Sequence, residues 1–417
     1  MARTEPLVFA LLLLFLRLEE GSVVVGRKEL LRRNNGLMTT LHDTSNDNDE
    51  STCKSRVEIY GYPCEDHTVT TEDGYILSMQ RIPSGRSKAA SGTNKVPVFL
   101  QHGLLVDGVS WLLNSPEESL GYILAENGYD VWIANTRGTI YSRGHTSLSS
   151  NDPAFWDWSW DELVTFDLPA TVGYVYQQTG QKKMHYVGHS LGTLIALASF
   201  SEQSLIDMLR SAALLSPIAY LDKIPSAFMQ GAARIYLVEQ LYWLGVAEFN
   251  PSSPEVKKLL KGICQGPGIN CYDLMSTITG KNCCLNSSSV QVALDHEPQP
   301  TSTKNMVHLA QTMRRGTITK YDYDDQGKNM EHYGQPTPPT YDMSAIPVDF
   351  PLFLSHGKAD VLSDVDDVRH FLGVVDGHDG VNLAVQYLED YAHADFIMAV
   401  NAKQIVYEPL MAFFNLH

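Results

Sequence analysis

The feature that most constrains this chain is a glycine-flanked serine at the end of an apolar run. Residues 184–187 form a short, mostly apolar run that leads into Gly188-His189-Ser190-Leu191-Gly192, and residues 193–198 have a helix-forming composition. A strand, a sharp turn and a helix in that order hold a serine on a strained turn, with its hydroxyl exposed above a sheet. The helix that starts there favours developing negative charge. The five-residue pattern also occurs at ordinary glycine-rich turns, but with these flanks it predicts that Ser190 is a nucleophile.

Composition and charge restrict the partners of the chain. Its 417 residues carry a formal net charge of −17, and 44% of them are hydrophobic. A nucleic-acid partner needs a basic patch, so the charge balance argues against one. The acidity suits a soluble protein of an acidic or extracellular compartment.

The N-terminus has the pattern of a secretory signal. Residues 7–16 are apolar, follow Arg3 and are too short to cross a bilayer. We therefore expect a signal peptide over residues 1–25, with a retained signal anchor as the alternative. No other stretch approaches transmembrane length, so no membrane span is expected after signal removal. The predicted location is the secretory pathway, ending outside the cell or in a vacuole- or lysosome-like compartment.

The six cysteines indicate disulfides, as expected for a secretory chain. Cys53 and Cys64 are close enough in sequence for one local bridge, and the other four cluster at Cys264, Cys271, Cys283 and Cys284. Zinc is the competing interpretation of that cluster, but it contains no histidine and two of its cysteines are adjacent. We therefore predict disulfides and no metal. The one glycosylation sequon, Asn286-Ser287-Ser288, lies beside the cluster and makes Asn286 the expected glycan site.

Strands and helices alternate on both sides of Ser190. Expected strands cover residues 68–71, 75–82, 95–100, 129–134, 184–187, 212–216, 349–355 and 381–387, and expected helices cover 119–128, 162–179 and 394 to 413 or 414. The first two strands flank an Asp-Gly turn and predict an antiparallel hairpin. The alternation that follows predicts a mostly parallel central sheet with helices on both faces. This is the pattern of an α/β-hydrolase fold.

The alternation is interrupted once, which predicts the division of the chain. After the signal peptide, residues 26–56 form a polar linker and residues 57–216 the first part of the core. Residues 217–347 show no regular alternation and are interpreted as a cap or lid inserted over the active-site end. Residues 348–417 complete the core. The alternative for the insertion is a separate helical domain with no link to the site.

A general base for Ser190 should follow the last strand of such a sheet. Of the 14 histidines, His393 follows the strand at 381–387 directly and precedes the final helix, so we predict that His393 is the base. The other histidines after the insertion fit less well, because they precede the candidate acid, lie on a helix, lie in a turn or end the chain: His356, His370, His378 and His417.

The third member of the constellation is an acid that orients the histidine. Asp360 lies on the loop after the strand that resumes behind the insertion, and it is the predicted acid. Asp222 is the rival, and Asp364 is better explained as a charge at a helix N-terminus. Two backbone amides should bind the oxyanion, and we expect them to be those of Leu191 and Leu104.

With these segments in place, the chain resembles the acid lipase family, which includes gastric and lysosomal lipases and plant relatives. The matching stretches span roughly residues 57 to 410. They are Gln101-His102-Gly103-Leu104-Leu105, Ser110-Trp111, Gly128-Tyr129-Asp130-Val131-Trp132, Asn135-Thr136-Arg137-Gly138, Phe155-Trp156-Asp157, Asp167-Leu168-Pro169-Ala170, His185-Tyr186-Val187-Gly188-His189-Ser190 and Ala392-His393-Ala394-Asp395-Phe396-Ile397.

The resemblance implies a triad of Ser190, Asp360 and His393, with the amides of Leu104 and Leu191 as the oxyanion hole. It also implies a mobile lid within the insertion, and hydrolysis of neutral-lipid esters at a lipid–water interface without a cofactor. Animal members carry Gln where this chain has Leu191, so the sequence is closer to plant members. Cys53 and Cys64 are additional to the family pattern and leave the disulfide pattern open.

Two other functions remain compatible with the sequence. A carboxylesterase or acyltransferase would act on smaller or phospholipid esters with the same residues. A catalytically silent binding protein would keep the fold alone, and it is disfavoured because all three triad residue types occur in the expected order.

Overall fold

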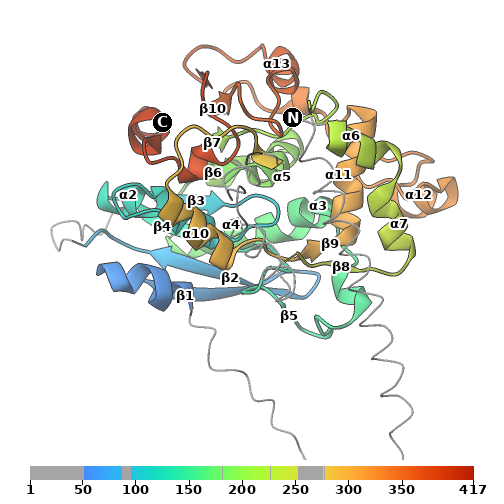
Figure 1. The fold of residues 1–417 in the computed structure, drawn as a ribbon, viewed down its shortest axis with the longest axis horizontal. Coiled ribbons are helices and arrows are strands. Elements are labelled where there is room, and N and C mark those ends of the chain that lie inside the picture. Colours follow the sequence, from blue (N-terminus) through green and yellow to red (C-terminus); the bar gives the residue numbers. More distant parts are fainter. Residues whose placement is uncertain (1–50, 87–94, 181, 226, 252–275, 277) are drawn as a thin grey trace, which may run out of the picture. The chain divides into compact units, whose positions relative to one another are not determined.

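The computed structural model describes residues 51–86, 95–180, 182–225, 227–251, 276 and 278–417 (Figure 1). The expected signal peptide, most of the expected linker, Cys264 and Cys271 lie outside the described residues. Residues Ser51–His417 form one compact unit. No helix within the described ranges combines the length and the apolar character that crossing a bilayer requires.

A mixed sheet lies at the centre of this unit. Within the described residues its strand order is β1-β2-β4-β3-β6-β7-β10-β11, and β5 pairs with β2. The strands are β1 (Glu65–Thr70), β2 (Tyr75–Ile82), β3 (Pro97–Gln101), β4 (Asp130–Ala134), β5 (Gly144–His145), β6 (Met184–His189), β7 (Leu209–Leu215), β10 (Leu352–Gly357) and β11 (Leu383–Leu388). The six strands from β4 to β11 in this order are parallel, whereas β1 and β2 pair antiparallel. The predicted α/β-hydrolase fold and its leading hairpin are confirmed.

Helices cover both faces of the sheet, as Figure 1 shows. In the core these are α2 (Leu120–Glu126), α3 (Trp160–Glu162), α4 (Leu168–Gln178), α5 (Leu191–Ser201), α13 (Val365–Val374), α14 (Asp395–Met398) and α15 (Glu408–Phe414). Alternate residues of a strand point to opposite faces. Tyr186 of β6 therefore joins one hydrophobic cluster and Val187 joins the other. Strand β6 is buried along its whole length.

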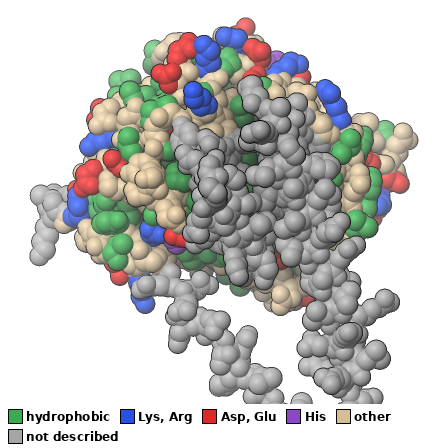
Figure 2. All heavy atoms as spheres, viewed as in Figure 1, with side chains coloured by type: hydrophobic (Ala, Val, Ile, Leu, Met, Phe, Trp, Pro, Cys, Tyr) green, Lys and Arg blue, Asp and Glu red, His purple; other side chains and the backbone are tan. Residues whose placement is uncertain are grey.

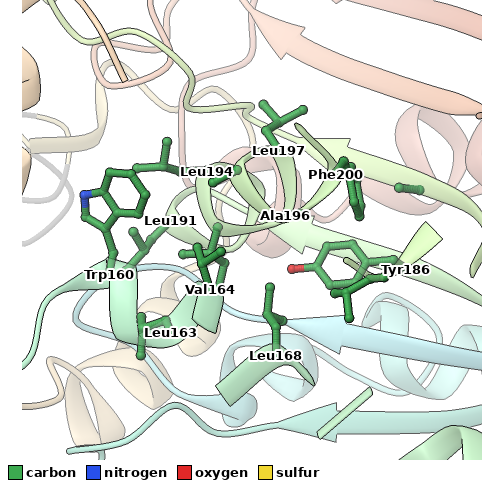
Figure 3. Packing of buried hydrophobic residues seen from close by; sticks show 14 of the residues in the cluster. Trp160, Leu163, Val164, Leu168, Tyr186, Leu191, Leu194, Ala196, Leu197 and Phe200 are labelled. Carbon is green, nitrogen blue, oxygen red and sulfur yellow. The ribbon is translucent and has the colours of Figure 1, made fainter. Parts of the chain in front are cut away.

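The helix that follows the glycine-flanked serine is anchored in the larger cluster. Every residue of α5 is buried. Figure 3 shows Leu191 and Leu194 beside Trp160 and Val164, which belong to the segment that leads into α4. Burial of a leucine side chain contributes roughly 2 kcal/mol to stability. The position of α5 is therefore set by apolar packing that Ser190 itself does not supply.

A helical insertion separates β7 from β10. It contains α6 (Ala227–Arg234), α7 (Leu237–Trp243), α10 (Ser287–His296), α11 (Thr303–Arg315), α12 (Gln326–Tyr333) and the two-residue strands β8 (Glu248–Phe249) and β9 (Thr301–Ser302). Helix α11 packs against α6 and α7, and β8 pairs antiparallel with β9.

The last helix is not continuous, which corrects the sequence prediction of one helix from 394 to 413 or 414. Helix α14 ends at Met398, and Ala399 has an extended backbone with ψ 135°. A π-helical turn, Lys403–Tyr407, then leads into α15. The break has a long-range cause. Ala399 forms a bridge with Leu285, and the amide of Val400 donates to the carbonyl of Cys284 at 2.9 Å.

Regular secondary structure also begins earlier in the chain than the sequence predicted. A helical turn at Cys53–Val57 buries Cys53 and Val57, and a disulfide joins Cys53 to Cys64. The expected linker, which ran to residue 56, therefore ends before this turn. A second disulfide joins the adjacent residues Cys283 and Cys284.

Candidate active site

Ser190 occupies a strained turn between β6 and α5. Its φ of 56° and ψ of −121° lie in a region that residues with a side chain rarely adopt. The amide of Ser190 donates to the carbonyl of Leu215 at 3.2 Å. The hydroxyl and the amide of Thr193 donate to the carbonyl of Ser190 at 2.6 and 2.8 Å. The neighbouring strand and helix therefore hold the strained backbone in place, and the strained strand–turn–helix geometry expected from the sequence is present.

Three glycines make the turn possible. A Cβ at Gly188 would lie 2.7 Å from the carbonyl oxygen of Gly192, and one at Gly192 would lie 2.5 Å from that of Gln101. A Cβ at Gly103 would lie 2.8 Å from the Cβ of Ser190. Gly103 therefore allows the loop after β3 to approach Ser190 closely.

His393 lies on the loop between β11 and α14, next to this turn. Nε2 of His189 donates to the main-chain carbonyl of His393 at 3.0 Å, and the centroids of the two rings lie 4.8 Å apart. Since His189 directly precedes Ser190, this contact brings the loop of His393 to the turn. Burial, together with the nearby His393, lowers the pKa of His189 to about 3, so His189 is neutral at the pH of most compartments.

Asp360 holds the imidazole of His393. Nδ1 of His393 lies 3.0 and 3.1 Å from the two carboxylate oxygens of Asp360. The amides of Leu362 and Ser363 donate to the carboxylate at 2.9 Å, and the hydroxyl of Ser216 donates to it as well. Burial opposes ionisation of Asp360, but His393 and these donors outweigh burial, and the pKa of Asp360 lies below its usual value. An ionised Asp360 keeps the proton of His393 on Nδ1 and leaves Nε2 as an acceptor.

The rival residues make other contacts. Asp222 pairs with Lys223, and Asp364 caps α13 by accepting from the amide of Asp366 at 2.9 Å. The competing histidines lie against neighbouring groups: His356 against Tyr387, His370 against Tyr220, His378 near the carbonyl of Val375 and His417 against Phe413. Of the acids and late histidines considered from sequence, the structure brings Asp360 and His393 together.

The two predicted oxyanion donors line one small pocket. Leu191 is the first residue of α5, and Leu104 follows Gly103 on the loop after β3. The pocket between them is also lined by Thr136 and Trp158 of the core and by Asn305 of the insertion. The insertion also contacts the loop of Leu104 directly, since the amide of Gln299 donates to the carbonyl of Leu105 at 2.8 Å.

Two polar residues of the site were not predicted from sequence. The hydroxyl of Ser216 contacts Asp360, and Ser216 has a positive φ of 53° directly after β7. The ring of His102 braces the loop of Leu104, because its Nδ1 donates to the carbonyl of Gly103 at 2.8 Å and its Nε2 accepts from the amide of Thr136 at 3.0 Å. Burial lowers the pKa of His102 to about 4. The sequence signal for Ser216 is its position at the end of an expected strand, whereas His102 also lies in the family-matching stretch Gln101-His102-Gly103-Leu104-Leu105.

Asn286 caps α10 rather than contacting the site. Its Oδ1 accepts from the amides of Ser288 and Ser289 at 2.7 and 3.3 Å. Its side chain is partly exposed. The nitrogen to which a glycan would attach is the other atom of the amide, so capping and the predicted glycosylation are compatible.

Comparisons with known proteins identify the family of this chain. Residues 53–115 match a family model described as a partial alpha/beta-hydrolase lipase region, and residues 96–251 match the model of the alpha/beta hydrolase fold. The chain is 54% identical to triacylglycerol lipase 2 of Arabidopsis thaliana, a match that covers 87% of each chain. It is 41% identical to triacylglycerol lipase 1 of the same plant over 88% of this chain and 90% of that one. It is 36% identical to the gastric triacylglycerol lipase of Bos taurus over 85% and 89% of the two chains.

Proposed function

The chain belongs to the acid lipase family of α/β hydrolases and is a serine ester hydrolase of the lipase type, and we propose on this premise that it hydrolyses triacylglycerols or steryl esters. The relatives named above act on triacylglycerols according to their names. The chain is more similar in sequence to the two plant relatives than to the bovine one. This agrees with Leu191, the residue after Ser190, where animal members of the family carry Gln. The protein is thus a lipase, and which neutral-lipid esters it hydrolyses is part of the proposal.

We propose that Ser190, His393 and Asp360 carry out the reaction. His393 takes the proton of the Ser190 hydroxyl as Ser190 attacks the ester carbonyl, and the amides of Leu104 and Leu191 stabilise the oxyanion. His393 then gives the proton to the leaving alcohol, and water releases the fatty acid by the same route in reverse. The observation that carries the proposal is the pairing of His393 with an ionised Asp360 at the turn of Ser190. The reaction needs no cofactor.

Residues 217–347 are proposed to be a cap that meets the lipid–water interface. Large apolar side chains are exposed at the end of α7 and in the turns that flank it, among them Ile235, Tyr236, Trp243 and Leu244. Figure 2 shows apolar side chains at the right-hand edge of the view, where Figure 1 places α7. Exposed apolar groups of this size favour contact with a lipid surface. Residues 57–216 and 348–417 then form the two parts of the catalytic core.

The proposed location is the secretory pathway and beyond it the cell exterior or a vacuole- or lysosome-like compartment. The disulfide between Cys53 and Cys64 is consistent with an oxidising route. The N-terminal apolar run supports a cleaved signal peptide, and the sequon supports a glycan on Asn286.

The test compares the wild type with Ser190→Ala on two substrates, an emulsified long-chain triacylglycerol and a soluble short-chain ester. Hydrolysis of the emulsion by the wild type, and its loss in Ser190→Ala, would support the lipase mechanism. Activity on the soluble ester alone would instead favour a carboxylesterase. Equal activity of both proteins would exclude Ser190 as the nucleophile.

A further inference from the structure

A short segment of the insertion lies directly on the loop of Asp360. We call residues 279–284 the strap. Gly280 forms an antiparallel bridge with Asp360. The backbone of Gly280 has a φ of 93°, and a Cβ there would lie 2.0 Å from the carbonyl oxygen of Ala359. No other residue fits this contact, so the strap and the acid loop are packed backbone to backbone.

The same strap holds the loop of His393. Three consecutive amides of that loop have defined acceptors. The amide of Ala392 donates to Asp395 at 2.8 Å, that of His393 donates to the carbonyl of Thr279 at 2.9 Å, and that of Ala394 donates to Oδ1 of Asn282 at 3.2 Å. Two of these three acceptors belong to the strap.

Two buried side chains join the strap to the loop. Asn282 is fully buried, and its Nδ2 donates to the hydroxyl of Thr279 at 2.7 Å and to the carbonyl of Gly280 at 3.2 Å. Asp395 is also fully buried and accepts from the amides of Cys283 and Cys284 at 3.1 and 3.2 Å. Asn282 thus reaches from the strap to the loop, and Asp395 reaches from the start of α14 to the strap.

We propose that Asn282 and Asp395 are positioning residues, which fix the backbone of His393 relative to Asp360 through the strap. The proposal rests on the catalytic roles proposed above for His393 and Asp360. The insertion then has a second role, because it holds the acid and the base in register. A displacement of about 1 Å in a catalytic group lowers the rate by roughly 100-fold, so loss of these contacts should reduce turnover while substrate binding persists.

The test uses two strap variants with matched controls in the full-length protein. Asn282→Ala removes the side chain that accepts from Ala394. Gly280→Ala forces the strap away from Ala359. The control for the first is Asn329→Ala, another buried asparagine of the insertion, which contacts Tyr323, Asp322 and Pro336.

The control for the second is Gly334→Ala. Gly334 also has a positive φ, of 70°, but a Cβ there would meet nothing within 4 Å. Gly334→Ala therefore reproduces the backbone strain of Gly280→Ala without the close contact between the new Cβ and a neighbouring carbonyl oxygen.

Turnover and binding are measured separately on a soluble short-chain ester, with active sites counted by a p-nitrophenyl phosphonate. In the strap variants we expect kcat per titrated site to fall roughly 10- to 100-fold with KM unchanged. The rate of phosphonylation should fall in parallel. Both controls should keep the wild-type kcat. Asn329→Ala should lower Tm about as much as Asn282→Ala, whereas Gly334→Ala should lower it only through the backbone strain.

The possible outcomes separate the inference from the function on which it rests. Wild-type kcat in both strap variants overturns the positioning role, and so does a failure of both to fold while the controls fold, because the strap would then serve stability. His393→Ala is assayed alongside. If it keeps the wild-type kcat, the proposed function itself is wrong. If it is inactive while the strap variants are fully active, only the positioning role is wrong.

Discussion

The ring of His189 donates a hydrogen bond from Nε2 to the main-chain carbonyl of His393, 3.0 Å away. This contact joins β6, which ends one residue before Ser190, to the loop that carries the proposed base, although His189 and His393 are 204 positions apart in sequence. Burial and the neighbouring His393 lower the pKa of His189 to about 3, so the ring stays neutral well into the acidic range, with its Nε2 hydrogen directed at this carbonyl.

Replacement of His189 should therefore affect turnover more than binding. In His189→Ala we expect kcat on a soluble ester to fall about tenfold, because the loop of His393 loses one of its anchors, while KM stays within error. His185→Ala is the control, since His185 is also buried in β6 and bonds to Ser211 at 2.7 Å. It should lower Tm and leave kcat unchanged. Equal kcat values in the two variants would contradict the prediction.

The pairing of Asp360 with His393 predicts a graded response to substitution. Asp360→Asn should lower kcat by about 10,000-fold, because the imidazole loses the partner that fixes its tautomer. Ser216→Ala should be milder, because it removes one donor from the carboxylate. The pKa of Asp360 lies below its usual value partly through that donor. Its removal raises this pKa, so the acid limb of the kcat/KM profile should move to higher pH. An unmoved acid limb in Ser216→Ala would contradict this account.

The close approach of Gly103 to Ser190 predicts sensitivity to a single methyl group. In Gly103→Ala the new Cβ would lie 2.8 Å from the Cβ of Ser190, so the loop of Leu104 must move. We expect at least a tenfold loss of kcat on a soluble ester. Gly173→Ala serves as the control, because a Cβ there meets nothing within 4 Å and α4 gains helix propensity. Full activity of Gly103→Ala would exclude a rigid approach of this loop to Ser190.

A buried carboxyl away from the site predicts higher stability in acid. Burial raises the pKa of Asp161 to about 6, even though the amide of Tyr321 and the hydroxyl of Tyr341 donate to it. A raised pKa means that the folded state binds the proton more tightly than the unfolded state does. The resulting stabilisation is complete below the unfolded pKa of about 3.9 and is lost as pH rises through about 6.

This contribution is measurable as a difference between two proteins. It amounts to roughly 3 kcal/mol between the two limits. Because Asp161→Asn cannot ionise, the Tm of the wild type relative to this variant should fall between about pH 4 and about pH 7. A pH-independent difference in Tm would show that Asp161 does not titrate in this range.

Local patterns were enough to predict the parts of the site that lie on consecutive elements. The glycines around Ser190 and the position of His393 after the last strand are each determined by a few neighbouring residues. Position alone favoured Asp360 over Asp222 without excluding Asp222, because both follow a strand, and the structure separates them by pairing Asp360 with His393 and Asp222 with Lys223.

Features that depend on distant segments were not predictable in this way. The final helix reads as continuous in sequence, and its break at Ala399 is caused by pairing with Leu285. Ser216 occupies a strand end with no local mark of function, and the family-matching stretch that contains His102 does not indicate which groups its ring contacts. Hydrophobic periodicity carries no information about such partners.

Residues 279–285 contact both the loop of Asp360 and the segment from His393 to Val400. These contacts restrict how this protein can be recombined with its relatives. A chimaera that exchanges residues 217–347 would also exchange the acceptors for the amides of His393 and Ala394 and the partner of Ala399. Substrate preference could then be transferred only together with a matching sequence at residues 392–400. The unit to exchange is therefore made of two separate segments, the insertion at residues 217–347 and the short C-terminal segment at residues 392–400.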